Sequence, residues 1–128
     1  MKSKFASRRL FSSTFATLCL SVAPASFAGT IWDAGGGTTT NINTASNWDG
    51  DVVNSLNGST AATFGTAGST ATINTNASFT GITFNRDAAF TIADGAGSLT
   101  VGSGGITVTL PTTTGRTHTI SESNLALG

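Results

Sequence analysis

The chain has 128 residues, the length of one domain or less, and a formal net charge of zero. Its charges are unevenly placed, because four of the six basic residues lie within the first nine positions. Residues 29–128 carry only Arg86 and Arg116 against six acidic residues, which leaves a net charge of −4 with His118 neutral. Two isolated arginines cannot displace the counterions of a phosphate backbone, so the composition excludes a nucleic-acid binder.

Residues 1–28 have the features of a secretory signal peptide. A basic segment ends at Arg9, an apolar stretch covers 10–22, and small residues lead to a cleavage site between Ala28 and Gly29. The apolar stretch is shorter than the roughly 20 residues that a membrane-spanning helix needs. We therefore expect an exported protein that is periplasmic, associated with the outer membrane or extracellular, and that meets the membrane only during export.

The only cysteine, Cys19, lies inside this apolar stretch. Removal of the leader leaves a chain that has no disulfide and no thiolate metal site. We expect no cofactor and no metal, and we expect backbone pairing and packing to stabilise the protein outside the cell.

The segment 29–128 has the composition of a β-protein. It contains 22 Thr, 16 Gly, 9 Asn and 9 Ser, which together make up more than half of its residues, and it has no Lys. Disordered chains are usually rich in Pro, Glu and Lys, whereas Thr, Ile, Val and Phe favour a pleated surface. No 11-residue window shows the apolar period of a helix, so we expect helix only in the leader.

From Thr63 onward, apolar residues alternate with threonine, and Gly, Asn and Asp separate the alternating runs. This pattern predicts short strands with irregular spacing. The predicted strands are Thr70–Asn74, Phe79–Phe84, Phe90–Ala93, Leu99–Val101, Ile106–Leu110 and Thr117–Ile120.

Two architectures suit such strands, namely a parallel β-helix or β-solenoid and a small β-sandwich. The threonine-rich composition favours the solenoid, because outward positions pair into ladders and inward positions take Ile, Val, Leu, Phe and Ala. We predict an all-β, irregular parallel β-solenoid segment. After the leader, a turn-rich cap with two tryptophans would cover 29–62, and solenoid coils would cover 63–128.

Three segments resemble the N-terminal region of bacterial autotransporter-associated β-strand repeat proteins. They are Trp32–Gly37, Thr44–Trp48 and Phe79–Phe84, and the glycine-bounded strands of 97–108 are also similar. The resemblance covers roughly 31–127 and implies a β-helical passenger region of a secreted or cell-surface protein. Members of that family continue into many repeats and end in a membrane barrel or a sorting signal. This chain stops at 123–128, in what looks like the next strand, so we expect a truncated reading frame or a fragment.

Trp32 and Trp48 are candidate ligand-binding or capping aromatics. Exposed rings would form a sugar-stacking platform, whereas buried rings would cover the open end of a solenoid core. We favour the cap, since buried aromatics outnumber binding ones.

Two groups of polar residues are candidate sites. Asp49 and Asp51, with Asn54 and Asn57, offer oxygens for calcium but lack a calcium-loop spacing, so a solvated turn is favoured. Arg116, His118 and Glu122 share a parity along an extended chain, but so does Ile120, and parity does not show that three groups converge.

We therefore predict no enzymatic activity and a structural role as a stalk, adhesin or matrix element, with binding through a Thr- and Asn-rich surface. The alternatives are a small secreted carbohydrate-binding module that uses Trp32 and Trp48, and a non-functional fragment of a longer passenger. Surface polysaccharide and a second copy of the chain, paired through open β-edges, are the expected partners.

Overall fold

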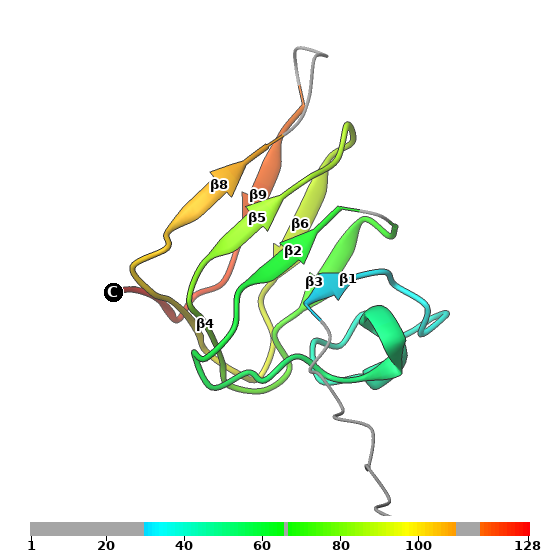
Figure 1. Ribbon diagram of the computed structural model, residues 1–128, viewed down its shortest axis with the longest axis horizontal. Coiled ribbons are helices and arrows are strands. Elements are labelled where there is room, and N and C mark those ends of the chain that lie inside the picture. The colour runs from blue at the N-terminus through cyan, green and yellow to red at the C-terminus, as the bar shows by residue number, and fades with distance from the viewer. Residues whose placement is uncertain (1–29, 66, 110–115) are drawn as a thin grey trace, which may run out of the picture.

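The computed structural model describes residues 30–65, 67–109 and 116–128 (Figure 1). The predicted leader and its cleavage site at Ala28 and Gly29 lie outside the described residues. The described residues form short β-strands and two turns of 3-10 helix. In chain order these are β1 (Ile31–Trp32), η1 (Ala45–Asn47), η2 (Asp49–Asp51), β2 (Ala62–Phe64), β3 (Thr70–Thr72), β4 (Ala77–Phe79), β5 (Ile82–Phe84), β6 (Phe90–Ala93), β7 (Leu99–Val101), β8 (Ile106–Val108), β9 (His118–Ile120) and β10 (Leu125–Leu127).

The strands form three parallel sheets, which the chain visits in rotation. The four-stranded sheet has the order β1-β2-β5-β8, and the two three-stranded sheets have the orders β3-β6-β9 and β10-β7-β4. Every pairing between these strands is parallel. Each passage through three strands therefore makes one coil that stacks on the previous one (Figure 1). The fold is all-β, parallel and solenoid-like, as predicted.

Residues 31–57 form a partial first coil below β2. Besides the pairing of β1 with β2, isolated parallel bridges join Asn41 to Thr72 and Asn57 to Ser78. These bridges carry the second and third sheets one layer further, although the chain forms no regular strand there. η1 and η2 lie beside β1 at the same end of the stack (Figure 1).

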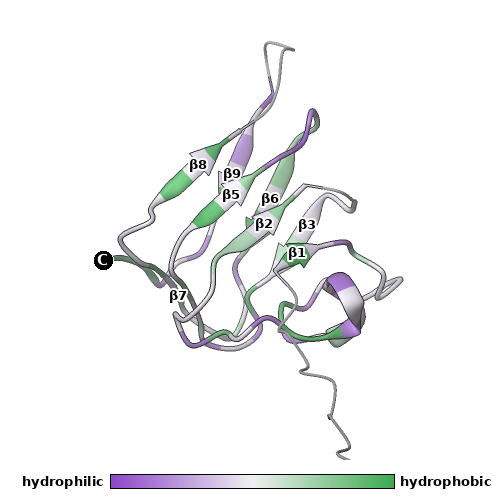
Figure 2. Cartoon of the chain, viewed as in Figure 1, coloured by the Kyte–Doolittle hydropathy of each residue, from purple (hydrophilic) through white to green (hydrophobic). Residues whose placement is uncertain are grey.

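The inward positions of successive coils form columns of apolar side chains. In the four-stranded sheet, Trp32, Phe64 and Phe84 are consecutive register partners, and the ring centroids of each neighbouring pair are 6.0 Å apart. All three rings are at most 2% exposed. Aromatic rings in such tilted arrangements contribute more than their buried area alone. Figure 2 shows apolar residues along the strands and hydrophilic residues at turns such as the one between β5 and β6.

The prediction of a single strand over 79–84 was wrong. β4 ends at Phe79, β5 begins at Ile82, and the two strands belong to different sheets. Gly81 makes this corner possible because it is buried against the next coil, where an added Cβ would lie 3.1 Å from the Gly104 backbone. The inward positions change from Ala77 and Phe79 to Ile82 and Phe84, so the period of two shifts by one residue at the corner.

The expectation of no helix after the leader was also wrong, because η1 and η2 are each a turn of 3-10 helix of three residues. Gly50 within η2 has φ +72°, and the following Asp51 has φ +54°. Glycine adopts this region freely, and Asp enters it more readily than most residues. Turns this short fall below the window in which a helical period can be detected.

Candidate functional site

Trp32 and Trp48 close one end of the stack. Both side chains are 0% exposed. Their rings meet edge to face with centroids 5.4 Å apart, and each lies 6.0 Å from Phe64. The Trp48 indole N–H donates a hydrogen bond to the Ile42 carbonyl at 2.7 Å. A sugar-stacking platform needs an exposed ring face, and neither tryptophan offers one in this structure.

The side chain of Asn47 holds the cap together. It is 0% exposed, and its amide donates to the carbonyls of Thr39 and Asn41, both at 3.1 Å. Its Oδ1 accepts the Gly36 N–H at 3.0 Å, and its own carbonyl accepts the Asp33 N–H at 2.9 Å. One residue therefore satisfies backbone groups from three segments of the cap, as buried polar groups must be satisfied. Asn47 lies within the segment 44–48 that carries the family resemblance, but no motif in the sequence indicates this role.

The carboxylate of Asp49 covers the outer edge of β1. Its Oδ1 accepts the backbone N–H groups of Thr30 and Ile31, at 2.6 and 2.8 Å. β1 is the outermost described strand of its sheet, so these bonds satisfy donors at a sheet edge. Asp49 thus bonds to backbone donors, while Asp51 is exposed on the outside of η2.

The two asparagines near this acidic pair also bond within the chain. Asn54 is 2% exposed, donates to the Ala61 carbonyl at 3.0 Å and accepts the Thr60 hydroxyl at 2.5 Å. Asn57 accepts the backbone N–H and the hydroxyl of Ser59, at 3.0 and 2.7 Å. The side-chain oxygens of Asp49, Asn54 and Asn57 therefore each accept hydrogen bonds from different groups of the chain.

Arg116, His118 and Glu122 do not bond to one another. Arg116 pairs with the Asp87 carboxylate at 3.3 Å. The His118 ring stacks on Phe84 with centroids 4.7 Å apart and planes 10° from parallel, and neither ring nitrogen has a hydrogen-bond partner among the described residues. Glu122 is 8% exposed. His118 therefore packs against the aromatic core, and the structure does not bring Arg116, His118 and Glu122 together as an acid–base group.

A corner between two coils carries a perturbed carboxyl group. The Ser123 hydroxyl donates to Asp94 Oδ1 at 3.2 Å and is the main reason that the pKa of Asp94 lies below its ordinary value of 3.8. Slight desolvation opposes this effect, and the Gly95 N–H, at 3.0 Å from the same oxygen, reinforces it. The bond joins the turn after β6 to the turn after β9, so it ties one coil to the next.

Rows of hydroxyl groups run along the outside of the sheets. Thr63, Thr83 and Thr107 are consecutive register partners on the four-stranded sheet. A second row of register partners consists of Thr70, Thr91 and Thr119. Outward threonine ladders were expected from the composition, but the lengths of the coils, and not a fixed spacing along the chain, determine which threonines align. β-Branched hydroxyl pairs of this kind favour the pairing of strands.

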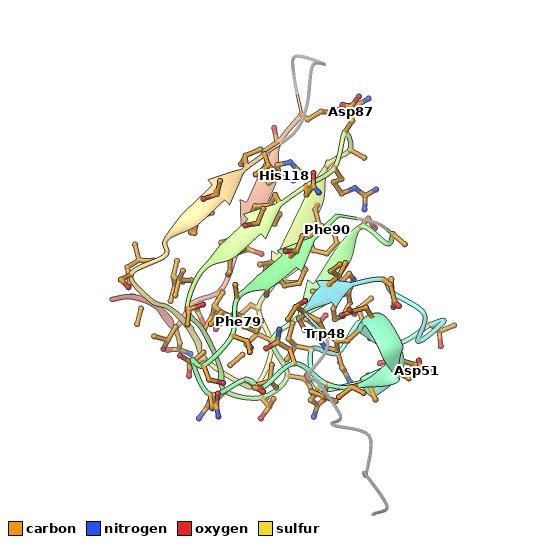
Figure 3. All side chains as sticks on the ribbon, viewed as in Figure 1. Trp48, Asp51, Phe79, Asp87, Phe90 and His118 are labelled. Atoms are coloured by element: carbon orange, nitrogen blue, oxygen red, sulfur yellow. The ribbon has the colours of Figure 1, made fainter. Side chains whose placement is uncertain are left out.

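Figure 3 shows Trp48, Phe79 and Phe90 inside the ring of strands, whereas Asp51 and Asp87 lie on turns at its outside. Among residues 30–65, 67–109 and 116–128, no three His, Cys, Asp or Glu side chains gather as a metal-binding group. Within the same ranges, no helix is long and apolar enough to cross a membrane.

Comparisons with known proteins add no assignment. No known protein family, no curated protein and no solved structure matches the chain. The fold and the contacts described above are therefore the basis for a proposal about function.

Proposed function

We propose that the chain is an exported structural segment, a passenger-like β-helix of an autotransporter-type or surface-sorted protein. One observation carries the proposal, namely the in-register stacking of coils with an apolar column inside and hydroxyl rows outside. Each added coil lengthens such a stack by about 4.8 Å and repeats the same outer surface. This architecture suits a stalk or matrix element, whose work is to span distance and present a repetitive face.

The hydroxyl rows support an adhesive role for that face. Threonine, serine and asparagine side chains offer both donors and acceptors, and they carry no charge that would restrict the partner. The segment 29–128 has a net charge of −4, and the rows themselves are uncharged. Surface polysaccharide, rich in hydroxyl groups, is the partner class that this chemistry fits.

The test is the location and the mass of the product in a bacterial host. The full chain is expressed with its leader, and fractions of cytoplasm, periplasm, outer membrane and medium are probed with an antibody against 85–97. The expected product begins at Gly29 and lies outside the cytoplasm. An Ala28→Leu variant blocks the small-residue cleavage site and serves as the control, and it should retain the leader.

A cytoplasmic product that still begins at Met1 would contradict export. Adhesion is tested separately, by pull-down of the exported protein on insoluble cellulose, chitin and peptidoglycan. Replacing Thr83 and Thr91 by Ala, on two different sheets, should weaken any such binding without changing the far-ultraviolet circular dichroism. Unchanged binding by this double variant would contradict the role of the hydroxyl rows.

A further inference from the structure

Asn57 is the only asparagine of the chain that precedes a glycine, in the sequence Asn57-Gly58-Ser59. A main-chain nitrogen can attack the side-chain carbonyl of the asparagine before it. Glycine hinders this attack least, because it has no Cβ. Asn57 is exposed, so water reaches its amide and the product of such an attack. The turn therefore brings a nucleophile, an electrophile and solvent together.

The side-chain carbonyl of Asn57 is held and polarised by Ser59. Its Oδ1 accepts the Ser59 N–H at 3.0 Å and the Ser59 hydroxyl at 2.7 Å. The ring that the first bond closes encloses the Gly58 peptide, so the carbonyl is folded back toward the residue that supplies the nucleophile. Two donors on a carbonyl oxygen also stabilise the negative charge that develops there when a nucleophile adds to the carbon. Ser59 thus supplies the donors of a small oxyanion hole.

The nitrogen of Gly58 takes part in a bond that can open locally. It donates to the Ser78 carbonyl at 2.7 Å, beside the isolated bridge that joins Asn57 to Ser78. Asn57 lies outside the strands, and Gly58 has φ +83°. An isolated bridge at an exposed turn opens at a lower free energy than a ladder between two strands. Its opening frees the Gly58 nitrogen for attack.

Asn76 provides a comparison within the same chain. It is also exposed, and the N–H of its successor, Ala77, donates to the Ser98 carbonyl at 2.8 Å, an analogous bond to the following coil. The Asn76 Oδ1 accepts the Ser98 hydroxyl at 3.1 Å, and Ala77 carries the Cβ that glycine lacks. The two asparagines are therefore alike in exposure and in backbone pairing. They differ in the groups that would promote attack.

We propose that Asn57 is a self-modification site, at which the chain converts the asparagine into aspartate and isoaspartate. The Gly58 nitrogen loses its proton to water and bonds to Asn57 Cγ. The bond from Cγ to Nδ2 breaks, and Nδ2 leaves as ammonia after taking up a proton from water. Water then opens the resulting succinimide. Cleavage between Cγ and the Gly58 nitrogen gives aspartate, and cleavage between the main-chain carbonyl and that nitrogen gives isoaspartate. The sum is an amide and water giving an acid and ammonia, with no other reactant.

The isoaspartate product changes the junction between the cap and the coils. Its main chain runs through the side-chain methylene, so the Gly58 N–H no longer meets the Ser78 carbonyl in the same register. The new carboxylate also adds to the negative charge of the segment 29–128. The inference concerns the chemistry of one turn, and it is independent of the export and the adhesion proposed above.

The experiment is prolonged incubation of the purified full chain at neutral pH, followed by peptide mass spectrometry. Asn57 should gain the mass of an amide-to-acid conversion, with isoaspartate detected by enzymatic methylation, while Asn76 in the same molecules keeps its amide. Ser59→Ala removes the hydroxyl donor and should slow the conversion about tenfold, the effect of one hydrogen bond to a developing charge. Ser59→Thr keeps the hydroxyl and should keep the rate. Ser103→Ala, at another exposed hydroxyl, is the matched control and should leave the rate unchanged.

Incubation in denaturant separates the turn from the local sequence. The turn is absent from the unfolded chain, so the parent and Ser59→Ala should convert at the same rate there. If Ser59→Ala does not fold by circular dichroism, the comparison of Asn57 with Asn76 in the parent decides. An Asn57 amide that persists in the folded chain, or equal conversion of the two asparagines, would overturn the proposal. A folded Ser59→Ala variant that converts as fast as the parent, or a difference that remains in denaturant, would also overturn it.

Discussion

At the residue scale, the buried amide of Asn47 organises the cap together with the two buried indole rings. Asn47 binds one N–H and two carbonyls through its side chain. The segment 35–41 before it consists of Gly, Thr and Asn and has no apolar side chain to bury, so these hydrogen bonds fix its path. A buried backbone group that loses its partner costs about 1–3 kcal/mol, which is large against the stability of a small domain.

The first prediction concerns this amide. Asn47→Ala leaves one N–H and two carbonyls of the cap without their partner, so it should lower the free energy of unfolding by about 2–4 kcal/mol. Chemical denaturation followed by tryptophan fluorescence measures the change, because Trp48 lies next to the substituted residue. Asn85→Ala, at an exposed turn, is the matched control and should change the stability by less than about 0.5 kcal/mol. Equal effects of the two variants would contradict the role of Asn47.

Corners carry the contacts between coils at the scale of elements. Strands of three residues offer few ladder hydrogen bonds, so side chains at the turns supply further links between layers. Arg116 reaches from the last coil to Asp87, and Ser123 reaches to Asp94. Exposed ion pairs contribute little, about 0–1 kcal/mol. Such links therefore align the coils more than they stabilise them.

The second prediction uses the corner bond to Asp94. Ser123→Ala removes the main cause of the lowered pKa, so the pKa of Asp94 should rise toward 3.8. Because the folded pKa is depressed, the carboxylate contributes stability above its unfolded pKa and loses that contribution as the pH falls through the folded value. The variant should therefore differ most from the parent near neutral pH, and the two should converge below pH 3.8.

NMR titration of the Asp94 carboxyl group measures the expected rise in its pKa. Thermal unfolding at a series of pH values measures the expected change in stability. Ser103→Ala, a change at an exposed hydroxyl on another turn, is the control and should leave both curves unchanged. An Asp94 titration that is the same in the Ser123→Ala variant would contradict the assignment of the bond.

The stack is one-dimensional at the scale of the whole molecule. Each coil contacts only the coils directly above and below it. The local stability of a strand therefore depends on whether it has a neighbouring coil on both sides or on one side. The cap covers β1 with hydrogen bonds and two indole rings, whereas β8 and β10 have a layer on one side. The two ends should therefore open with different ease.

The third prediction is a gradient of hydrogen exchange. Amides in β8, β9 and β10 should exchange fastest, and those in β2 and β5 should exchange slowest, because local opening begins where fewest contacts are lost. The amide of Ile31, although it lies in an outermost strand, should be protected by Asp49. Uniform protection from β2 to β10 would show a single cooperative unit instead.

The alternation of apolar residues with threonine determined the class of fold, because a period of two has one physical reading, a strand with one face buried. The sequence therefore predicted β3, β6, β7, β8 and β9 to within two residues at either end. It did not predict the corner between β4 and β5, although Thr80 and Gly81 shift the alternation by one residue there, because each of the two runs is only three residues long and they were joined into one strand.

Tertiary structure decided which residues lie above one another. The register that aligns Thr63, Thr83 and Thr107 arises from coils of unequal length, so no fixed interval in the sequence reveals it. The burial of both tryptophans and the role of Asn47 arise in the same way, because their partners come from segments brought together by the turns. The sequence by itself determined a parallel β architecture with an apolar interior. The stacking of coils alone decided that one end is closed by the cap and that the other exposes its core, since burial depends on the neighbouring layer and not on the residue.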